Sequence, residues 1–544
     1  MANGSKRGLG QLFARKSVEQ MHAEHAQSEL KKSLGPLNLV LLGIGCIIGT
    51  GIFVLTGRAA AQFAGPGIMI SFVITGFLCA LVALCYSELA AAIPVSGSAY
   101  SYTYASLGEF VAWIMGVLLL LEYGVAASTV AVGWSGYVTS LLHDLGVDIP
   151  AALTAAPGVD VKDLMTGEMV KGIINLPALI GIVAVTCLLA FGVSESASVN
   201  NVVVAIKVTV VIAFIVIGAF FVDPANWSPL IPPQVPAPPP GSDMSIGGQI
   251  WTALGNVVTG HSRDSAFGVG GLIAAASTIF FAYIGFEAVS TAGAESKNPA
   301  RDMPIGILGS LLVCTILYIL TCAVLVGVMP YTELSKDDPA PIATAVNHIT
   351  AHSQVDLRWF ALVVKVGAFA GLSSVMLVLL YGQTRIFYTM ARDGLVPPIF
   401  ARVNPKTKTP IVNTILVGIV AAGFAGFTGL DFLGDTTNVG TLVAFMLICV
   451  TVIYLRFARP NLNRPFKIPT WLIVIIAVLG ASMCFLLVMS LMSEARTRNF
   501  FIPYVGVGII IYFIYGMWNS KLAKGETVTG HEPNPDLGIA KSGD

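Results

Sequence analysis

The sequence has few charged residues. Only 11% of its 544 residues are Asp, Glu, Lys or Arg, whereas 55% are apolar, and the mean hydropathy is +0.80. A soluble domain typically carries about 25% charged residues, so a soluble, fibrous or disordered chain is excluded. The 30 basic and 30 acidic residues cancel, which leaves no net charge to attract nucleic acid. The composition therefore indicates a protein that crosses a membrane many times.

The sequence also lacks the usual arrangements of reactive side chains. Its eight cysteines all lie inside apolar runs, which argues against disulfides and against a zinc site in a loop. Its seven histidines all lie outside those runs, so a histidine metal centre or proton relay within the membrane is excluded. No G-x-x-x-x-G-K-[ST] segment is present, so direct use of ATP is not expected. With no nucleophile beside a base and no cluster of metal ligands, we expect neither an enzyme nor a bound cofactor or metal.

Long apolar runs make up most of the chain. A spanning helix needs about 20 mostly apolar residues. Twelve runs of that kind lie at approximately 36–60, 66–92, 108–141, 173–193, 199–222, 271–294, 303–329, 357–391, 410–428, 434–457, 470–492 and 499–520. None of them shows the continuous polar stripe of a channel. The prediction is an all-α polytopic membrane protein with twelve transmembrane helices.

The runs and the basic residues predict how the chain is divided and oriented. The predicted segments are a cytoplasmic N-terminal segment at 1–35, five helices at 36–222, an extracellular loop at 223–270, five helices at 271–457, two helices at 458–520 and a cytoplasmic tail at 521–544. The loop contains seven prolines between Pro229 and Pro240, which favours extended geometry. Lys and Arg are concentrated in segment 1–35 and after the eighth and tenth runs, which indicates that both termini are cytoplasmic. We expect a multi-pass protein of a plasma membrane with this orientation.

Two apolar runs contain glycines at their centres. The first run reads G-I-G-C-I-I-G-T-G-I-F over Gly43–Phe53, and the sixth carries Gly285 within F-F-A-Y-I-G-F-E. Close packing of helices through small residues is one interpretation. The other is a pair of helices that unwind, the first at Gly49–Gly51, at matching places in two repeats of five helices, a pattern that indicates a transporter site. The free amides of such a break attract a carboxylate and its free carbonyls accept hydrogen bonds from an ammonium, so the physics suits an amino acid zwitterion.

Four motifs together resemble a known family. They are the Gly43–Phe53 run, E-S-K-N-P-A-R-D-M-P-I-G at 295–306, G-Q-T-R-I-F-Y-T-M-A-R-D-G at 382–394 and R-P-F-K-I-P at 464–469. They are similar to the amino acid–polyamine–organocation (APC) superfamily of transporters, and most of all to its cationic amino acid transporter (CAT) family in the bacterial, twelve-helix form. The similarity runs from about residue 30 to residue 520. It implies the LeuT-type five-plus-five inverted repeat, with discontinuous helices one and six, and transport by alternating access.

The resemblance also implies a set of substrate contacts at the two interruptions. The substrate carboxylate is expected at the amides of Thr50, Gly51 and Ile52. The amino group is expected at carbonyls of Ile47 or Ile48 and of Phe280, Phe281 and Ala282. Tyr283 and Ile284 are expected to border the side-chain pocket, and Phe281 is a candidate outer gate.

Lys207 interrupts the apolar run V-V-V-A-I-K-V-T-V-V-I-A. One interpretation is a lysine whose long stem reaches back to the membrane surface. The other is a proton carrier, because a site that alternates between dry and hydrated alternately disfavours and favours the charged amine. The resemblance implies that the ammonium replaces the sodium ion of sodium-coupled relatives, at a site formed by carbonyls near Gly45 and Ile48 and by the hydroxyls of Ser373 and Ser374. Sodium coupling at this position is therefore disfavoured.

Glu122, Glu287 and Lys365 also lie within apolar runs, where an ionisable residue is a functional hypothesis by default. Glu122, in L-L-L-L-E-Y-G-V-A, has three interpretations that stay open: it pairs with Lys207, it binds a cationic substrate side chain, or it belongs to an internal hydrogen-bonded network. Glu287 follows the second interruption and is a candidate for a bond across the bundle. Lys365 faces either a cavity or the membrane surface.

These observations predict a secondary active amino acid transporter that works as an amino acid/proton symporter. A sodium-independent exchanger and a transporter-like amino acid sensor are the alternatives. The substrate is a neutral amino acid such as alanine or a cationic one, and the coupling ion is a proton. The bilayer is the other expected partner, together with a small single-helix membrane protein of the kind that packs on some relatives.

Overall fold

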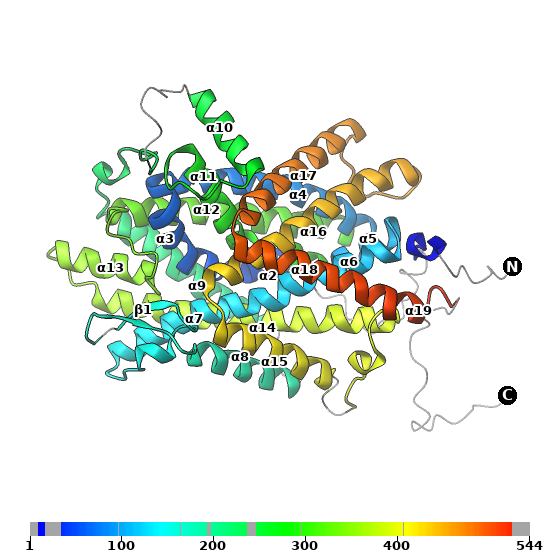
Figure 1. Ribbon diagram of the computed structural model, residues 1–544, viewed down its shortest axis with the longest axis horizontal. Helices are drawn as coiled ribbons and strands as arrows, with labels where there is room; N and C mark the ends of the chain where they lie inside the picture. Colours follow the sequence, from blue (N-terminus) through cyan, green and yellow to red (C-terminus); the bar gives the residue numbers. More distant parts are fainter. Residues whose placement is uncertain are drawn as a thin grey trace.

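The computed structural model describes residues 9–16, 34–95, 97–163, 165–192, 197–236, 246–293, 295–405, 407 and 409–524. Most of the N-terminal segment, the end of the proline-rich stretch and the tail after Lys524 lie outside the described residues. Helices run side by side along the long axis of the molecule (Figure 1). The end that carries the first 3-10 helix η1 (Leu9–Phe13) and the last helix α19 (Met517–Asn519) is called the termini end below. The opposite end, which carries the strands β1 and β2, is called the far end.

Eighteen α-helices follow one another along the described chain. They are α2 (Pro36–Ile47), α3 (Thr56–Ala59), α4 (Ile68–Ala92), α5 (Ser98–Ser106), α6 (Glu109–Leu119), α7 (Ala126–Asp144), α8 (Leu176–Ala190), α9 (Ala197–Ala219), α10 (Ile246–Thr259), α11 (Gly268–Ile279), α12 (Pro299–Val328), α13 (Pro341–His352), α14 (Arg358–Arg392), α15 (Ile411–Phe427), α16 (Leu430–Ala458), α17 (Thr470–Met492), α18 (Ala495–Ile511) and α19. Short 3-10 or π-helical pieces join or interrupt them: η2 (Gly51–Leu55), η3 (Ala60–Ala64), η4 (Gly65–Gly67), η5 (Leu120–Val125), η6 (Ala151–Leu153), η7 (Pro224–Trp227), η8 (Phe280–Tyr283), η9 (Glu287–Ala292), η10 (Pro398–Ala401) and η11 (Tyr512–Gly516).

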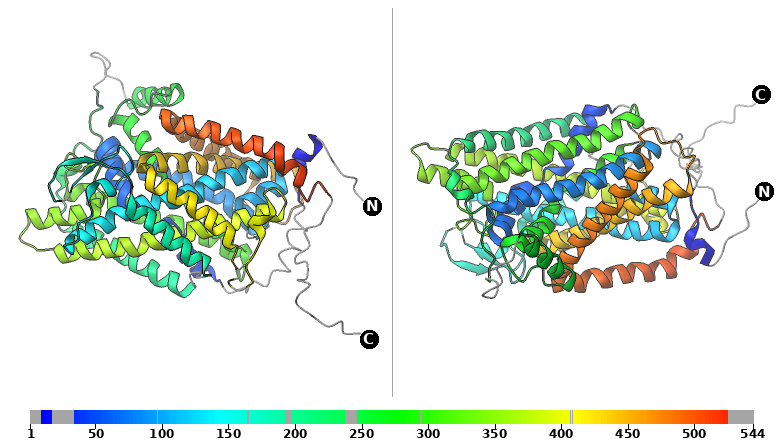
Figure 2. Two further views of the ribbon diagram at one scale, coloured as in Figure 1. Left: turned by 60° about the horizontal axis from the view of Figure 1, so that its bottom comes forward. Right: turned by 90° about the horizontal axis from the view of Figure 1, so that it is seen from above.

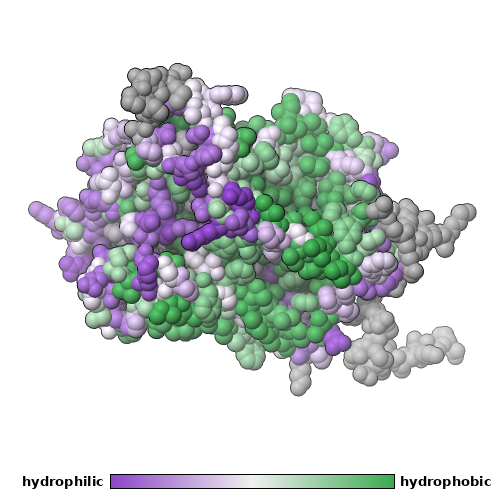
Figure 3. Space-filling view, in the orientation of Figure 1, coloured by the Kyte–Doolittle hydropathy of each residue, from purple (hydrophilic) through white to green (hydrophobic). Residues whose placement is uncertain are grey.

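Nine helices in the described part of the chain are long and apolar enough to cross a membrane, and three shorter apolar helices accompany them. Each predicted apolar run falls on helical structure, so the predominantly helical membrane architecture is confirmed. Many large apolar side chains of these helices are exposed, for example Ile316 and Leu320 on α12. Figure 3 shows the resulting apolar band, beside a hydrophilic surface at the far end. Such a band is stable only against lipid.

The interior is built by helices that are distant in sequence. The helix α12 packs against α2 and α4, α14 packs against α7, and α16 packs against α17. Both views of Figure 2 show α18 running along the outside of this bundle. The short antiparallel strands β1 (Asp160–Lys162) and β2 (Met169–Lys171) lie at the far end, together with α13. The apolar runs did not predict these strands, or the helices α5, α10 and α13, because each lies in a connecting segment outside those runs.

The termini end is held together by one buried carboxyl group. Glu109, the first residue of α6, accepts hydrogen bonds from the side chains of Gln11, Tyr104, Tyr512 and Ser520. Its backbone N–H donates to the carbonyl of Ala14 at 2.9 Å. The piece of N-terminal chain at 9–16 is therefore docked on the bundle between α6 and the segment from η11 to α19.

Candidate functional site

The first apolar helix is interrupted where its glycines are concentrated. Helix α2 ends at Ile47, and Ile48 leaves the helical conformation with φ −73° and ψ 98°. Helical structure resumes at Thr50 and continues as the π-helical turn η2. The break therefore leaves carbonyls at the end of α2 and amides at the start of η2 without helical partners.

A second interruption divides the segment from α11 to η9. Helix α11 passes into the 3-10 turn η8, after which Ile284 is extended with ψ 132° and Gly285 has φ +122°. A residue with a side chain is strained at that φ, which explains a glycine at this position.

The two interruptions are in direct backbone contact. A Cβ atom on Gly51 would lie 2.2 Å from the Cα of Ala282, and one on Gly285 would lie 2.8 Å from the carbonyl carbon of Cys46. Each break therefore presents a glycine to the backbone of the other. No larger residue fits at either position without moving one of the two chains apart.

Lys207 and Tyr318 bind the carbonyls of the first break. The ammonium of Lys207, fully buried on α9, donates hydrogen bonds to the carbonyl oxygens of Gly45 and, at 3.1 Å, of Ile48. The hydroxyl of Tyr318 on α12 donates to the carbonyl of Ile47 at 2.9 Å. The orientation of the Lys207 side chain into the bundle argues against a lysine that reaches back to the membrane surface. Its charge is compensated by backbone dipoles, which makes burial at this depth possible.

Helix α14 supplies the other side of the lysine site. Gly371 faces Lys207, and a Cβ on it would lie 3.3 Å from the Lys207 Cβ and Cδ atoms. Ser374 is buried on the same helix. The hydroxyl of Ser373 donates to the carbonyl of Phe369 at 2.7 Å and accepts from the indole of Trp134 at 2.9 Å, so these hydrogen bonds tie it to α14 itself and to α7.

All the predicted substrate-binding residues are buried around the two interruptions. They are Ile47, Ile48, Thr50, Gly51, Ile52, Phe280, Phe281, Ala282, Tyr283 and Ile284. The carbonyl of Gly51 accepts from the Thr56 hydroxyl at 2.9 Å. The hydroxyl of Tyr283 donates to the carbonyl of Phe72 on α4 at 2.8 Å, and its ring packs against Phe72 and Tyr318.

A cavity of about 410 Å³ leads from the termini end to these interruptions. Asn38 and Thr389 line it near the termini end, and Cys46, Tyr86 and Glu287 line it beside the breaks. The predicted substrate-binding residues themselves do not line this cavity. Cys46, which does line it, directly precedes Ile47, the first of these residues in the chain.

Two buried carboxyl groups lie close to each other here, and one of them, Glu287, lines this cavity. Glu122 is fully buried in η5, and among the described residues neither of its oxygens has a hydrogen-bond partner. Glu287 lies near enough to act on it electrostatically. The Glu287 carboxylate accepts a hydrogen bond from the N–H of Gly285 at 2.9 Å. This bond joins residues only two positions apart and provides an acceptor for the amide that the second break leaves free. In this conformation Glu122 does not pair with Lys207 and instead lies beside Glu287, the carboxyl group with which it interacts.

Lys365, another ionisable residue of the apolar runs, forms an ion pair between two helices. The ammonium of Lys365 on α14 pairs with the carboxylate of Asp144 on α7 at 2.5 Å and is buried. Within the part of the chain that the structure describes, no group of three or more His, Cys, Asp or Glu side chains could hold a metal ion.

Two residues that contact the breaks were not predicted from the sequence. Tyr318 binds the first break, and Asn438 on α16 donates to the carbonyls of Ser277 and Thr278 at 2.9 and 3.1 Å, at the end of α11. The only available signal was a polar side chain within an apolar run.

Comparisons with known proteins agree with this geometry. A family model described as amino acid permease matches residues 34–515. The chain is 43% identical over 514 residues to the branched-chain amino acid permease BcaP of Bacillus subtilis (strain 168), covering 94% of this chain and 99% of that permease. It is 41% identical over 516 residues to the methylthioribose transporter of the same bacterium, covering 95% of this chain and 100% of that transporter. It is 34% identical over 456 residues to cationic amino acid transporter 4, vacuolar, of Arabidopsis thaliana, covering 83% of this chain and 68% of that protein.

The family model spans most of the chain, and the two bacterial relatives match over nearly their full lengths. Membership of this superfamily implies a LeuT-like fold, in agreement with the two interrupted helices. The chain belongs to the amino acid permease family of the APC superfamily, and it is a multi-pass membrane transporter of amino acids or related solutes rather than an enzyme.

Proposed function

We propose that the chain is an amino acid/proton symporter that works by alternating access. Its twelve transmembrane helices form two inverted repeats of five, at 36–222 and 271–457, followed by two more helices at 458–520. The observation that supports the repeat is that each block of five begins with an interrupted helix, from α2 to η3 and from α11 to η9. Glycine-interrupted helices in corresponding places are typical of transporters whose site lies between two repeats.

The termini end faces the cytoplasm in this proposal. Described arginines near that end, on or after α14 and α16, support the orientation because positive charge is retained on the cytoplasmic side. They are Arg385, Arg392, Arg402, Arg456, Arg459 and Arg464. The chain is then a plasma-membrane protein whose cavity, as the structure has it, opens to the cytoplasm.

The substrate zwitterion binds between the two breaks. Its carboxylate lies at the amides of Thr50, Gly51 and Ile52, where the start of η2 provides free N–H groups. Its ammonium lies at free carbonyls of the two breaks. The carbonyl of Ile47 already accepts from Tyr318, but a carbonyl oxygen has two lone pairs and accepts a second donor.

Lys207 carries the coupling proton, and its contacts with Gly45 and Ile48 are the observation that supports this role most directly. The ammonium places a positive charge at the last carbonyls of α2, which are the position expected for the sodium ion of sodium-coupled relatives. Loss of one proton to water removes that cation and leaves the carbonyls of the break without a charged partner. The conformation of the first break and the protonation of Lys207 are thereby linked. The cavity reaches Cys46, next to Gly45, which gives the released proton a short route to water.

The substrate class depends on Glu122. Two buried carboxyl groups that repel each other, as Glu122 and Glu287 do, either share a proton or bind a cation. A shared proton suits a neutral amino acid, as the name of the BcaP relative suggests, whereas an ionised pair suits arginine or lysine, as the names of the plant relatives suggest. The name of the methylthioribose transporter suggests a related solute as a third candidate.

The decisive experiment is uptake into sodium-free proteoliposomes with and without an inside-alkaline pH gradient. Labelled alanine, leucine, arginine and methylthioribose are tested separately. Accumulation of any one amino acid that depends on the gradient supports symport. Uptake that requires preloaded amino acid instead identifies an exchanger, and binding with no flux identifies a sensor.

The variant Glu122→Gln separates the substrate classes. If the carboxylate binds a cationic side chain, Glu122→Gln reduces arginine uptake at least about tenfold more than alanine uptake, because a lost charged partner costs about 1.5–3 kcal/mol. Equal losses for both substrates would refute that contact.

A further inference from the structure

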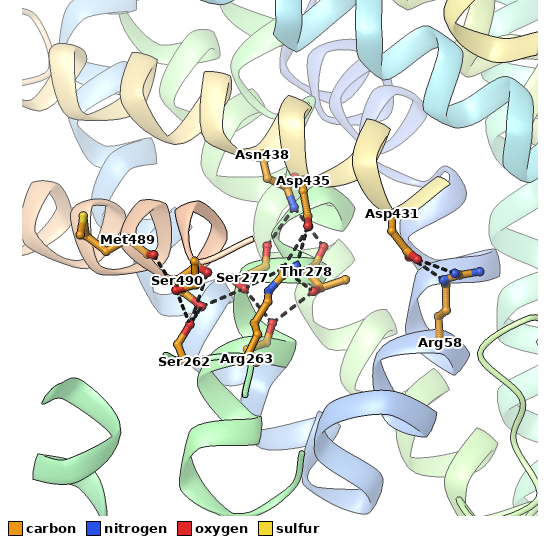
Figure 4. A network of polar contacts seen from close by, with 12 residues as sticks. Arg58, Ser262, Arg263, Ser277, Thr278, Asp431, Asp435, Asn438, Met489 and Ser490 are labelled. Carbon is orange, nitrogen blue, oxygen red and sulfur yellow. Dashed lines mark hydrogen bonds and ion pairs between the residues drawn. The ribbon is translucent and has the colours of Figure 1, made fainter. Parts of the chain in front are cut away.

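The far end of the second broken helix is held by one buried ion pair. Arg263 precedes α11, and its guanidinium donates to both carboxylate oxygens of Asp435 on α16, at 2.5 and 3.0 Å. The exposed fractions of the two side chains are only 14% and 6%. Figure 4 shows Arg263 pointing between Ser277 and Thr278 toward Asp435. The pair therefore connects the chain that leads into α11 with a helix of the surrounding bundle.

The same group of residues also holds the last turn of α11. Arg263 donates to the hydroxyl of Thr278 at 3.2 Å and to that of Ser277 at 3.4 Å. Asn438, one turn after Asp435 on α16, donates to the backbone carbonyls of both residues. These carbonyls lie at the end of α11, just before the second break. The contacts therefore fix both the position of α11 and the direction of its free carbonyl end.

The part of the first broken helix nearest the far end, which includes η3, also contacts the surroundings of Arg263. The N–H of Phe267, at the start of α11, donates to the carbonyl of Phe63 in η3 at 2.7 Å. The Arg263 guanidinium lies 5.6 Å from the centroid of the Phe63 ring, within the range of a cation–π contact. The outer halves of both broken helices are therefore connected through the surroundings of Arg263.

A second ion pair on α16 provides a contrast. Arg58 on α3 binds both oxygens of Asp431 at 2.9 and 2.8 Å, one turn before Asp435. The Asp431 side chain is 59% exposed, so water competes for it and the pair contributes little. Water has far less access to Asp435, and separating this carboxylate from Arg263 requires water to enter the far end.

We propose that Arg263, Asp435 and Asn438 form a latch that closes the far end while the cavity at the termini end is open. The latch holds α11 against α16, and its release is the step that admits water and substrate from the far end. This inference rests on the alternating-access part of the proposed function. It assigns to these three residues control over which end is open, not contact with the substrate.

Hydrogen–deuterium exchange of the purified full-length protein tests the latch without any substrate. The variant is Arg263→Gln, with Asp435→Asn as a second variant in case the first does not fold. Release of the latch should speed exchange in the outer halves at 51–64 and 268–279 by about tenfold. It should at the same time slow exchange in the cavity walls at 98–106 and 287–292 by about threefold, because opening one end closes the other.

If Arg263 only stabilised the fold, its replacement would not speed exchange at one end and slow it at the other. Faster exchange at both ends, or no change at either, would overturn the latch. The matched control is Arg358→Gln, also at the far end, whose contact with Asp356 at 3.8 Å joins two exposed side chains; it should leave both ends unchanged. The charge-swapped variant Arg263→Asp with Asp435→Arg should return toward the wild-type pattern.

This readout is independent of the transported solute. If the reciprocal change occurs but no amino acid is accumulated in proteoliposomes, the latch stands and the proposed substrate is wrong. If amino acid is accumulated but exchange does not change, the proposed function stands and the latch is wrong.

Discussion

The two breaks both leave backbone groups without helical partners, but side chains of opposite charge bind those groups. At the first break, the carbonyl end of α2 is bound by the ammonium of Lys207 and by the hydroxyl of Tyr318. At the second, the free amide of Gly285 is bound by the carboxylate of Glu287, and the carbonyl end of α11 is bound by Asn438. The ionisable side chain at each break, Lys207 at the first and Glu287 at the second, has the sign of charge that complements the backbone groups it binds.

This difference in charge indicates that the two breaks have different roles. The partner of the first break is a cation that has a neutral form, so protonation can alter that break. The carboxylate of the second break belongs to the same short segment as the amide it binds, and it follows the segment when the helix moves. We therefore expect coupling to depend on the first break, and local geometry to depend on Glu287 at the second.

The largest effect is expected where the two breaks touch. In Gly51→Ala the added Cβ would lie 2.2 Å from the Cα of Ala282, so the backbones must separate and both breaks lose their shape. Transport should fall below about 1% of wild type, consistent with a clash that costs about 3 kcal/mol or more. Uptake per amount of purified protein measures it.

Gly423→Ala is the matched control for that clash. Gly423 lies within α15 with nothing near its missing Cβ, so the alanine variant should transport normally and be slightly more stable. If Gly51→Ala transports as well as this control, the breaks are not in the contact described.

A smaller effect is expected from the carboxylate of the second break. Glu287→Leu leaves the N–H of Gly285 without its acceptor and should destabilise the protein by about 1–3 kcal/mol. Glu287→Gln keeps an acceptor oxygen and should lose less than about 1 kcal/mol. Apparent melting temperatures of the purified variants give the comparison, and equal shifts for both would show that the hydrogen bond to Gly285 does not matter.

The smallest effect is expected from the neutral partner of the first break. Tyr318→Phe removes one hydrogen bond to Ile47 and should lower stability by about 1 kcal/mol, with a KM within about threefold of wild type. Uptake kinetics measure the KM. A loss of uptake above tenfold would mean that Tyr318 contacts the substrate itself.

The sequence predicted the features that interrupt an apolar pattern locally. Glycine at Gly49 and Gly285 weakens a helix wherever it stands, and Lys207 is conspicuous in any run of valine and isoleucine. These local signals were enough for the helical membrane architecture and for the positions of both breaks.

The partners of the breaks were not predictable in the same way. Tyr318 meets Ile47 across 271 positions of sequence, and Asn438 meets Ser277 across 161. Such contacts depend on how α12 and α16 pack, and no local pattern encodes that packing. The helices α10 and α13 were missed because a search for spanning runs does not register short helices in the connecting segments.

In the proposed mechanism, the ammonium of Lys207 couples the proton to the first break. The most direct measurement compares Lys207→Ala with wild type in proteoliposomes, once for accumulation driven by an inside-alkaline gradient and once for exchange between preloaded and external amino acid. We expect that the variant still exchanges amino acid at a rate within about tenfold of wild type but no longer accumulates it. Gradient-driven accumulation at the wild-type level by Lys207→Ala would contradict it.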